Sequence, residues 1–138
     1  MERDERTMKN QNPFVAVLGA GSWGVALACL LDANGCTASI WAHLESDAEH
    51  LRKNRSLEPR LPGAWIPESI EITSDLYACL SRADVVLVAV PSAFMKPVAE
   101  QCAGSGLLKG RLVISATKGL QVGTLRTMTD LLAEAWAN

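Results

Sequence analysis

A hexapeptide with three glycines, residues 19–24, joins a short apolar run to a helical stretch and has the spacing G-x-G-x-x-G. The apolar run, 14–18, predicts a strand that is buried on both faces. The residues after the loop, 22–33, are rich in alanine and leucine and end at Asn34–Gly35, a usual helix stop. A strand, a tight glycine turn and a helix in this order predict the first half of a βαβ unit.

Strands and helices alternate along the rest of the chain. We expect further strands at 37–41, 70–73, 84–90 and 111–116, and helices at 46–55, 75–82, 92–102 and 124–137. Because crossovers between parallel strands are right-handed, this order predicts an α/β fold with a doubly wound parallel sheet (Rossmann fold) and strand order 3-2-1-4-5. We expect one such domain over 14–138, preceded by a mobile N-terminal tail over 1–13.

Composition excludes several other classes of protein. The chain has 138 residues and a formal net charge of −2, so neither nucleic acid nor a membrane surface is an expected partner. The longest apolar run, 85–90, is far shorter than the about 20 residues of a membrane-spanning helix, and the first residues lack a secretory signal. Together these features predict a cytoplasmic protein. The chain has four cysteines: Cys29, Cys36, Cys79 and Cys102. They have neither C-x-x-C spacing nor histidines at metal-ligand spacing, which predicts buried reduced thiols and no metal site.

Each glycine of the hexapeptide has a separate predicted role. Gly19 permits the tight turn, Gly21 removes a side chain that would block a pyrophosphate, and Gly24 lets the helix approach the strand. The backbone amides near the start of the helix are then open to an anionic phosphate. The alternative is a purely structural turn. We interpret the hexapeptide as a cofactor-binding loop comprising Gly19, Ala20, Gly21, Ser22, Trp23 and Gly24.

The end of the second predicted strand bears on the choice of cofactor. The dinucleotide fingerprint places an acidic residue there, which holds the 2′-hydroxyl of the adenosine ribose. This chain instead has Ala42–His43, with Glu45 two residues later. His43 does not repel a 2′-phosphate and could donate a hydrogen bond to it, which favours NADP or dual use over strict NAD. The alternative is a solvated loop histidine.

The ends of the fourth and fifth predicted strands should flank the nicotinamide half of the cofactor. Ligands bind beyond the carboxyl ends of such strands, here at Pro91–Ser92 and at Thr117–Gly119. Lys118 could hold a phosphate or hydroxyl of the substrate, and the alternative is a solvated lysine at a strand end. Pro91 is expected to terminate the fourth strand. We also include it among the cofactor-binding residues.

Several segments together resemble one family, the N-terminal domain of NAD(P)-dependent glycerol-3-phosphate dehydrogenase, from about Phe14 to the chain end. The combination of Ser-Trp after the second glycine with Ala-Thr-Lys-Gly-Leu after the fifth strand is more specific than the glycine loop alone. Two departures are Val25, where the family usually has threonine, and Ala93, where histidine is common. The matching segments are 17–24, 41–43, 61–63, 73–76, 83–84, 88–92 and 115–120.

The resemblance implies a reaction and roles for individual residues. The family transfers hydride between NAD(P)H and dihydroxyacetone phosphate, giving sn-glycerol 3-phosphate for glycerophospholipid synthesis. It implies that Ser22 and Trp23 contact the dinucleotide, that His43 lies by the adenosine 2′ position, and that Lys118 reaches cofactor and substrate. The general acid/base lysine of the family belongs to a C-terminal helical domain, so we expect no catalytic residue in these 138 residues. We therefore expect this chain alone to bind dinucleotide without turnover. The full-length enzyme of such a family could form a homodimer.

Two other functions remain open at this point. One is a dinucleotide-sensing regulatory module of the kind attached to potassium transporters. Such modules resemble strict NAD readers with an acid at the end of the second strand, and the absence of that acid here, together with Lys118, argues against one. The other is the nucleotide domain of a related two-domain dehydrogenase.

Overall fold

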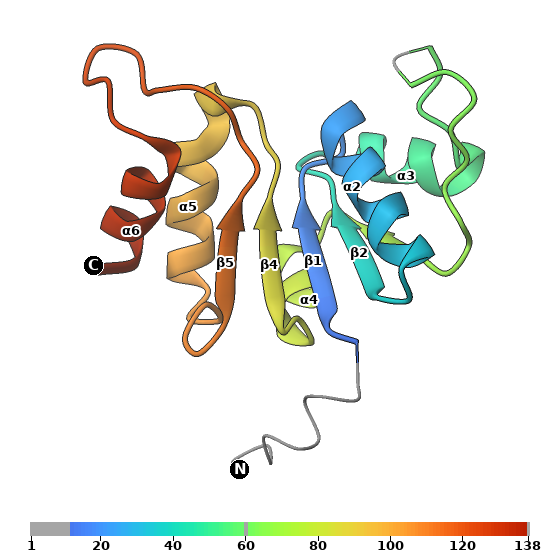
Figure 1. The fold of residues 1–138 in the computed structure, drawn as a ribbon, viewed down its shortest axis with the longest axis horizontal. Helices are drawn as coiled ribbons and strands as arrows, with labels where there is room; N and C mark the ends of the chain where they lie inside the picture. The colour runs from blue at the N-terminus through green and yellow to red at the C-terminus, as the bar shows by residue number, and fades with distance from the viewer. Residues whose placement is uncertain (1–11, 60, 138) are drawn as a thin grey trace.

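The computed structural model describes residues 12–59 and 61–137 and contains the parallel sheet that the sequence predicts (Figure 1). The five strands lie in the order β3-β2-β1-β4-β5, which confirms the doubly wound α/β fold. In register, Val17 lies between Ile40 and Leu87. The strands are β1 Phe14–Leu18, β2 Thr37–Trp41, β3 Glu71–Thr73, β4 Val85–Val88 and β5 Leu112–Ser115.

Helices cover the two faces of the sheet. Side chains of α2 and α3 pack on the face that presents Val15 and Val17, whereas α4, α5 and α6 pack on the face that presents Ala16 and Leu18. The apolar residues of β1 thus alternate between two cores, which explains why that strand is apolar throughout. The helices are α2 Ser22–Ala33, α3 Glu45–Asn54, α4 Leu76–Ser81, α5 Met95–Gly104 and α6 Met128–Ala137, with a short 3-10 helix η1 Ser92–Phe94.

The expected tail lies almost entirely outside the described residues. Residues 1–11 are not described, so their predicted mobility stays a prediction. Of the two tail residues that are described, Asn12 donates a side-chain hydrogen bond to the carbonyl of Gly35 at 3.0 Å.

Several element boundaries differ from the sequence prediction. The expected helix at 46–55 ends at Asn54, because Arg55 has a left-handed backbone with φ 51°. The expected strand at 84–90 covers only Val85–Val88, and beyond it the carbonyl of Val90 accepts a hydrogen bond from the hydroxyl of Thr117. The expected helix after Pro91 begins with a 3-10 turn before α5.

The last helix begins four residues later than predicted. Leu125 has φ 57°, and Leu120 pairs with Thr127 in an isolated bridge, so residues 120–127 form a loop rather than helical turns. At the start of α6, the hydroxyl of Thr127 accepts a hydrogen bond from the amide of Asp130, and the Asp130 carboxylate accepts one from the amide of Thr127. This reciprocal cap fixes the helix start. β1 and β2 have the predicted bounds, β3 begins one residue later than predicted, and β5 and α4 are each shorter by one residue at both ends.

The thiols are free, as predicted, but only two are buried. Cys79 and Cys102 lie in the core, whereas Cys29 and Cys36 are half-buried at its rim. The prediction of burial was wrong for this second pair, because the outer side of α2 and the turn before β2 remain partly open to solvent. Among the described residues, no helix is long and apolar enough to cross a membrane.

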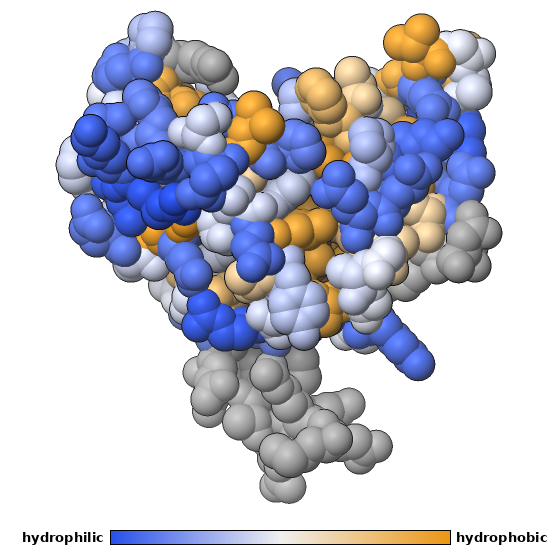
Figure 2. Space-filling model, turned by 180° about the vertical axis from the view of Figure 1, so that it is seen from behind, coloured by the Kyte–Doolittle hydropathy of each residue, from blue (hydrophilic) through white to orange (hydrophobic). Residues whose placement is uncertain are grey.

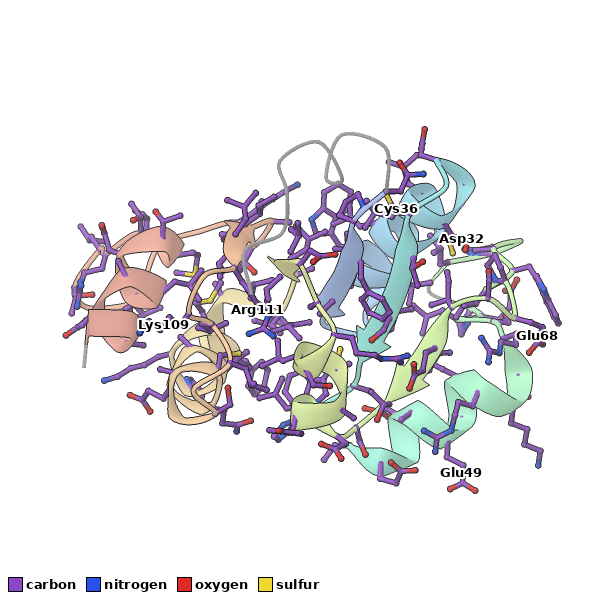
Figure 3. The ribbon with its side chains drawn as sticks, turned by 90° about the horizontal axis from the view of Figure 1, so that it is seen from below. Asp32, Cys36, Glu49, Glu68, Lys109 and Arg111 are labelled. Carbon is purple, nitrogen blue, oxygen red and sulfur yellow. The ribbon has the colours of Figure 1, made fainter. Side chains whose placement is uncertain are left out.

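The amino edge of the sheet is closed by side chains. Arg111 donates to the carbonyl oxygens of Ala83 at 2.7 Å and Ser81 at 3.2 Å beneath β4 and β5 (Figure 3). The carboxylate of Asp84 accepts the amide of Phe14 at 3.0 Å, which anchors the start of β1. The glycine loop and the other candidate site residues lie at the opposite edge, beyond the carboxyl ends of the strands.

Candidate functional site

The glycine loop has the close backbone contacts that its sequence predicts. Gly19 has φ 130°, and a Cβ atom there would lie 2.5 Å from the carbonyl oxygen of Ala89. At Gly24, a Cβ atom would lie 2.1 Å from the carbonyl oxygen of Gly19. These contacts confirm that Gly19 forms the tight turn and that Gly24 brings α2 against it.

Gly21 differs from the other two glycines. Its backbone has φ −79° and ψ −174°, which other residues adopt, and a Cβ atom there would meet nothing within 4 Å. It is the N-cap of α2 but has no side chain with which to accept the helix amides, and the first turn contains no acidic residue. The first helical hydrogen bond runs from Val25 to Gly21, so the preceding amides are free of intrahelical partners. The space beside Gly21 therefore suits an anionic group such as a pyrophosphate.

This loop opens into a notch at the carboxyl edge of the sheet. Figure 2 shows the notch at the top of the molecule, between two projecting lobes. One lobe is the loop between α3 and β3, and the other is the loop between β5 and α6, as Figure 1 shows. The second lobe exposes the apolar side chains of Leu120, Val122 and Leu125.

Trp23 connects the glycine loop to the end of β5. Its indole Nε1 donates a hydrogen bond to the carbonyl oxygen of Ala116 at 2.9 Å, while 51% of the residue remains exposed. Because β4 lies between β1 and β5, this bond spans the carboxyl end of β4. The first turn of α2 and the predicted nicotinamide side of the site are thus joined directly.

Thr117 holds the ends of β4 and β5 together, a role that the sequence analysis missed. Its hydroxyl donates to the carbonyl oxygen of Val90 at 2.8 Å and lies 3.3 Å from that of Val88. The neighbouring Lys118 is exposed at the carboxyl end of β5, as predicted. A threonine beside a strand end gives no sequence signal for this bond, since its partners lie 27 and 29 residues away.

Pro91 and Gly119 lie on the two loops that Thr117 joins. Pro91 is exposed after β4, and its carbonyl accepts the amide of Phe94 at 2.9 Å, which begins η1. Gly119 has φ 106°, and a Cβ atom there would lie 3.5 Å from the Ser92 side chain. The two loops are therefore adjacent, as the predicted nicotinamide side of the site requires.

His43 lies at the same edge of the sheet, beyond β2. It is exposed, and its ring meets Trp41 edge-on with centroids 5.7 Å apart. Trp41 is itself fixed, because it is 2% exposed and its indole donates to the carbonyl of Ser74 at 3.0 Å. The amide of Gly19 donates to the carbonyl of Trp41 at 3.0 Å, so the end of β2 and the glycine loop are neighbours.

A second hollow, of about 400 Å³, lies between α5 and α6. Its lining mixes charges of both signs from Lys96, Glu100 and Glu134 with apolar surface from Leu131. None of the predicted site residues lines it, so the notch beside the glycine loop remains the candidate site. Within residues 12–59 and 61–137, no cluster of three or more histidine, cysteine or carboxylate side chains could hold a metal ion.

The sheet order, the glycine turn and the open N-terminus of α2 define a dinucleotide-binding domain of the Rossmann class. A profile of the family described as "NAD-dependent glycerol-3-phosphate dehydrogenase N-terminus" matches residues 14–138. The chain belongs to this family.

Individual relatives agree with this membership. The chain is 36% identical over 121 residues to a glycerol-3-phosphate dehydrogenase (NAD(P)+) of Fusobacterium nucleatum, covering 87% of this chain and 36% of that protein. It is 38% identical over 121 residues to one of Prosthecochloris aestuarii, covering 88% of this chain and 36% of that protein. It thus spans little more than a third of the length of these relatives.

Solved structures show the same fold. The crystal structure of glycerol-3-phosphate dehydrogenase from Coxiella burnetii aligns with a TM-score of 0.81 at 27% identity, covering 92% of this chain and 38% of that chain. The enzyme from Plasmodium falciparum aligns with a TM-score of 0.80 at 19% identity, covering 94% of this chain and 40% of that chain, and supports the fold alone. These similarities favour NAD or NADP as the cofactor and do not favour a regulatory sensing module.

Proposed function

We propose that this chain is the dinucleotide-binding part of an oxidoreductase that interconverts dihydroxyacetone phosphate and sn-glycerol 3-phosphate. The observation that carries the proposal is the open space beside Gly21, next to uncapped amides at the start of α2, in a chain whose family profile matches from residue 14 onward. When bound, the nicotinamide cofactor supplies or accepts the hydride.

The residues of the glycine loop bind the pyrophosphate in this proposal. Amides of Ser22 and Trp23 donate to its oxygens, and the positive end of the α2 dipole favours the anion. His43, at the end of β2, contacts the adenosine ribose and can donate to a 2′-phosphate. This arrangement favours NADPH weakly over NADH.

Lys118 binds both the cofactor and the substrate in this proposal. It is exposed at the notch, beside the Thr117 hydroxyl that fixes the ends of β4 and β5. Its ammonium group can pair with the phosphate of the substrate. Pro91, on the adjoining loop, contacts the nicotinamide half.

The proton transfer belongs to a part of the enzyme outside these 138 residues. Because the chain spans 36% of its relatives, we propose that the acid/base lysine lies in a C-terminal helical domain. The 138-residue chain then binds dinucleotide without turnover. We place the full-length enzyme in the cytoplasm, where the four free thiols stay reduced. A homodimer is the oligomeric state that we propose for it.

Titration of the chain with NADH and NADPH, each with and without sn-glycerol 3-phosphate, tests this proposal. We expect both dinucleotides to bind and sn-glycerol 3-phosphate to bind to the complex. Lys118→Ala should weaken binding of sn-glycerol 3-phosphate by roughly tenfold, because one charge-assisted contact is lost. Exposed Lys109→Ala, distant from the notch, is the matched control (Figure 3). Unchanged binding by Lys118→Ala contradicts its assigned role, and reduction of dihydroxyacetone phosphate by this chain contradicts the assignment of the acid/base group.

A further inference from the structure

A carboxylate near the end of β2 is held on the side that faces away from the glycine loop. Glu45, the first residue of α3, follows His43 by two positions. Its carboxylate accepts hydrogen bonds from the hydroxyl of Ser74 and the guanidinium of Arg52. Ser74 directly follows β3, and β3 pairs with β2 on the side opposite β1. The carboxylate is therefore drawn toward β3, whereas the glycine loop follows β1.

Arg52 is itself fixed in this position. Its Nη1 donates to the carbonyl oxygen of Ile72 in β3 at 3.1 Å, so the guanidinium bridges the backbone of β3 and Glu45. The hydrogen bonds from Ser74 and Arg52 lower the pKa of the Glu45 carboxyl below its usual value. Glu45 is thus ionised at neutral pH, and its charge is balanced within the chain.

The place of this carboxylate matters because an acid at the end of the second strand distinguishes two cofactors. Such an acid hydrogen-bonds the 2′-hydroxyl of NAD and repels the 2′-phosphate of NADP. We propose that Ser74 and Arg52 set the cofactor preference by holding Glu45 away from the adenosine ribose, so that His43 meets the 2′ position and NADPH is accepted. This inference rests on the proposed function of the site.

The direct test measures the dissociation constants of NADPH and NADH for this chain and compares their ratio between variants. Arg52→Gln removes the balancing charge of the Glu45 carboxylate and leaves the Ser74 hydroxyl as the partner that still holds it. We expect it to weaken NADPH relative to NADH by roughly threefold to tenfold, the effect of one partly exposed charge on a nearby phosphate. Ser74→Ala should shift the ratio in the same direction. Because it removes only a hydroxyl, it provides the same test if Arg52→Gln does not fold.

A double variant separates this role from a direct contact between Arg52 and the 2′-phosphate. If Arg52 acts through Glu45, then Glu45→Gln combined with Arg52→Gln restores the ratio to within about twofold of the unsubstituted chain. Glu49→Gln is the matched control, because Glu49 lies one turn further along α3 and points away from the sheet (Figure 3).

The outcomes distinguish this inference from the proposed function. An unchanged ratio in Arg52→Gln and Ser74→Ala overturns the inference while dinucleotide binding still stands. A loss of NADPH binding that the double variant does not restore also overturns it, since Arg52 then contacts the phosphate itself. If the unsubstituted chain binds neither dinucleotide, the proposed function fails, and this inference fails with it.

Discussion

The indole Nε1 of Trp23 and the carbonyl oxygen of Ala116 lie 2.9 Å apart, in a hydrogen bond between residues 93 positions apart in the sequence. The bond joins the first turn of α2 to the end of β5 across the strand that separates β5 from β1. Together with the hydrogen bond from the Thr117 hydroxyl to Val90, it connects the start of α2 with the ends of β4 and β5. A substitution on either side should therefore affect the other.

Trp23→Phe should loosen the loop between β5 and α6. The substitution keeps an aromatic ring but removes the donor, and the net contribution of such a bond is about 0.5–1.5 kcal/mol. Hydrogen–deuterium exchange should show faster exchange over residues 116–127. Trp65→Phe is the control. Trp65 is 64% exposed and lies across the notch, in the loop between α3 and β3. Equal exchange in the Trp23 variant and the unsubstituted chain would show that the bond does not hold this loop.

Gly24→Ala should be among the most damaging single substitutions in the chain. The new methyl group would lie 2.1 Å from the carbonyl oxygen of Gly19, and that oxygen belongs to backbone that cannot rotate away. We expect a loss of more than about 2 kcal/mol in the free energy of unfolding, measured by urea denaturation. Gly104→Ala, at a site with open space around the new methyl group, should be tolerated. A stable Gly24→Ala variant would contradict the close approach of α2 to the glycine turn.

Thr117→Val should separate the role of the hydroxyl from that of the side-chain shape. Valine keeps the branched shape but leaves the carbonyl oxygen of Val90 without this donor, which should cost about 1–2 kcal/mol in stability. It should also weaken binding of sn-glycerol 3-phosphate, because Lys118 follows directly. Thr117→Ser retains the hydroxyl and should recover both properties. If valine and serine behave alike, the hydroxyl does not position this loop.

The buried thiols predict a loss of stability at alkaline pH. Burial raises the pKa of Cys79 to about 11 and that of Cys102 to about 12, from an ordinary value of 9.0. The unfolded chain thus releases these protons at lower pH than the folded chain. Their contribution to stability is complete below pH 9 and is lost as the pH rises toward 11 to 12.

Urea denaturation at a series of pH values measures this loss. Cys102→Ala removes one of the two groups and should make the decline of stability with pH shallower, whatever its effect on stability at neutral pH. An equally steep decline in this variant would assign the alkaline loss to other groups.

The sequence predicted the elements whose signals are local. Both ends of α2 were predicted correctly, because a glycine precedes the helix and Asn34–Gly35 follow it. The start of α6 was missed although its signal is also local: Thr127 and Asp130 have the spacing of a capping box. The predicted start was Thr124, but the left-handed backbone of Leu125 prevents a helix there.

The contacts that shape the site could not be predicted, because they join distant parts of the chain. Trp23 was expected to contact a dinucleotide, and its bond to Ala116 depends on the spacing between β1 and β5. The orientation of Glu45 toward Ser74 likewise depends on which strand lies outside β2. Sequence order implies that these residues gather at one edge of the sheet, but it does not specify which atoms meet.

The central claim, that the space beside Gly21 receives a dinucleotide, is tested most directly by titrating NADPH into the unsubstituted chain and into Gly21→Ala. The backbone at Gly21 suits alanine and the new methyl group meets no atom of the chain, so stability should change by less than about 1 kcal/mol. We predict that the unsubstituted chain binds NADPH and that the folded Gly21→Ala variant binds it at least about tenfold more weakly, since the methyl group occupies space needed by the pyrophosphate. Equal NADPH affinity in two folded proteins would contradict the claim.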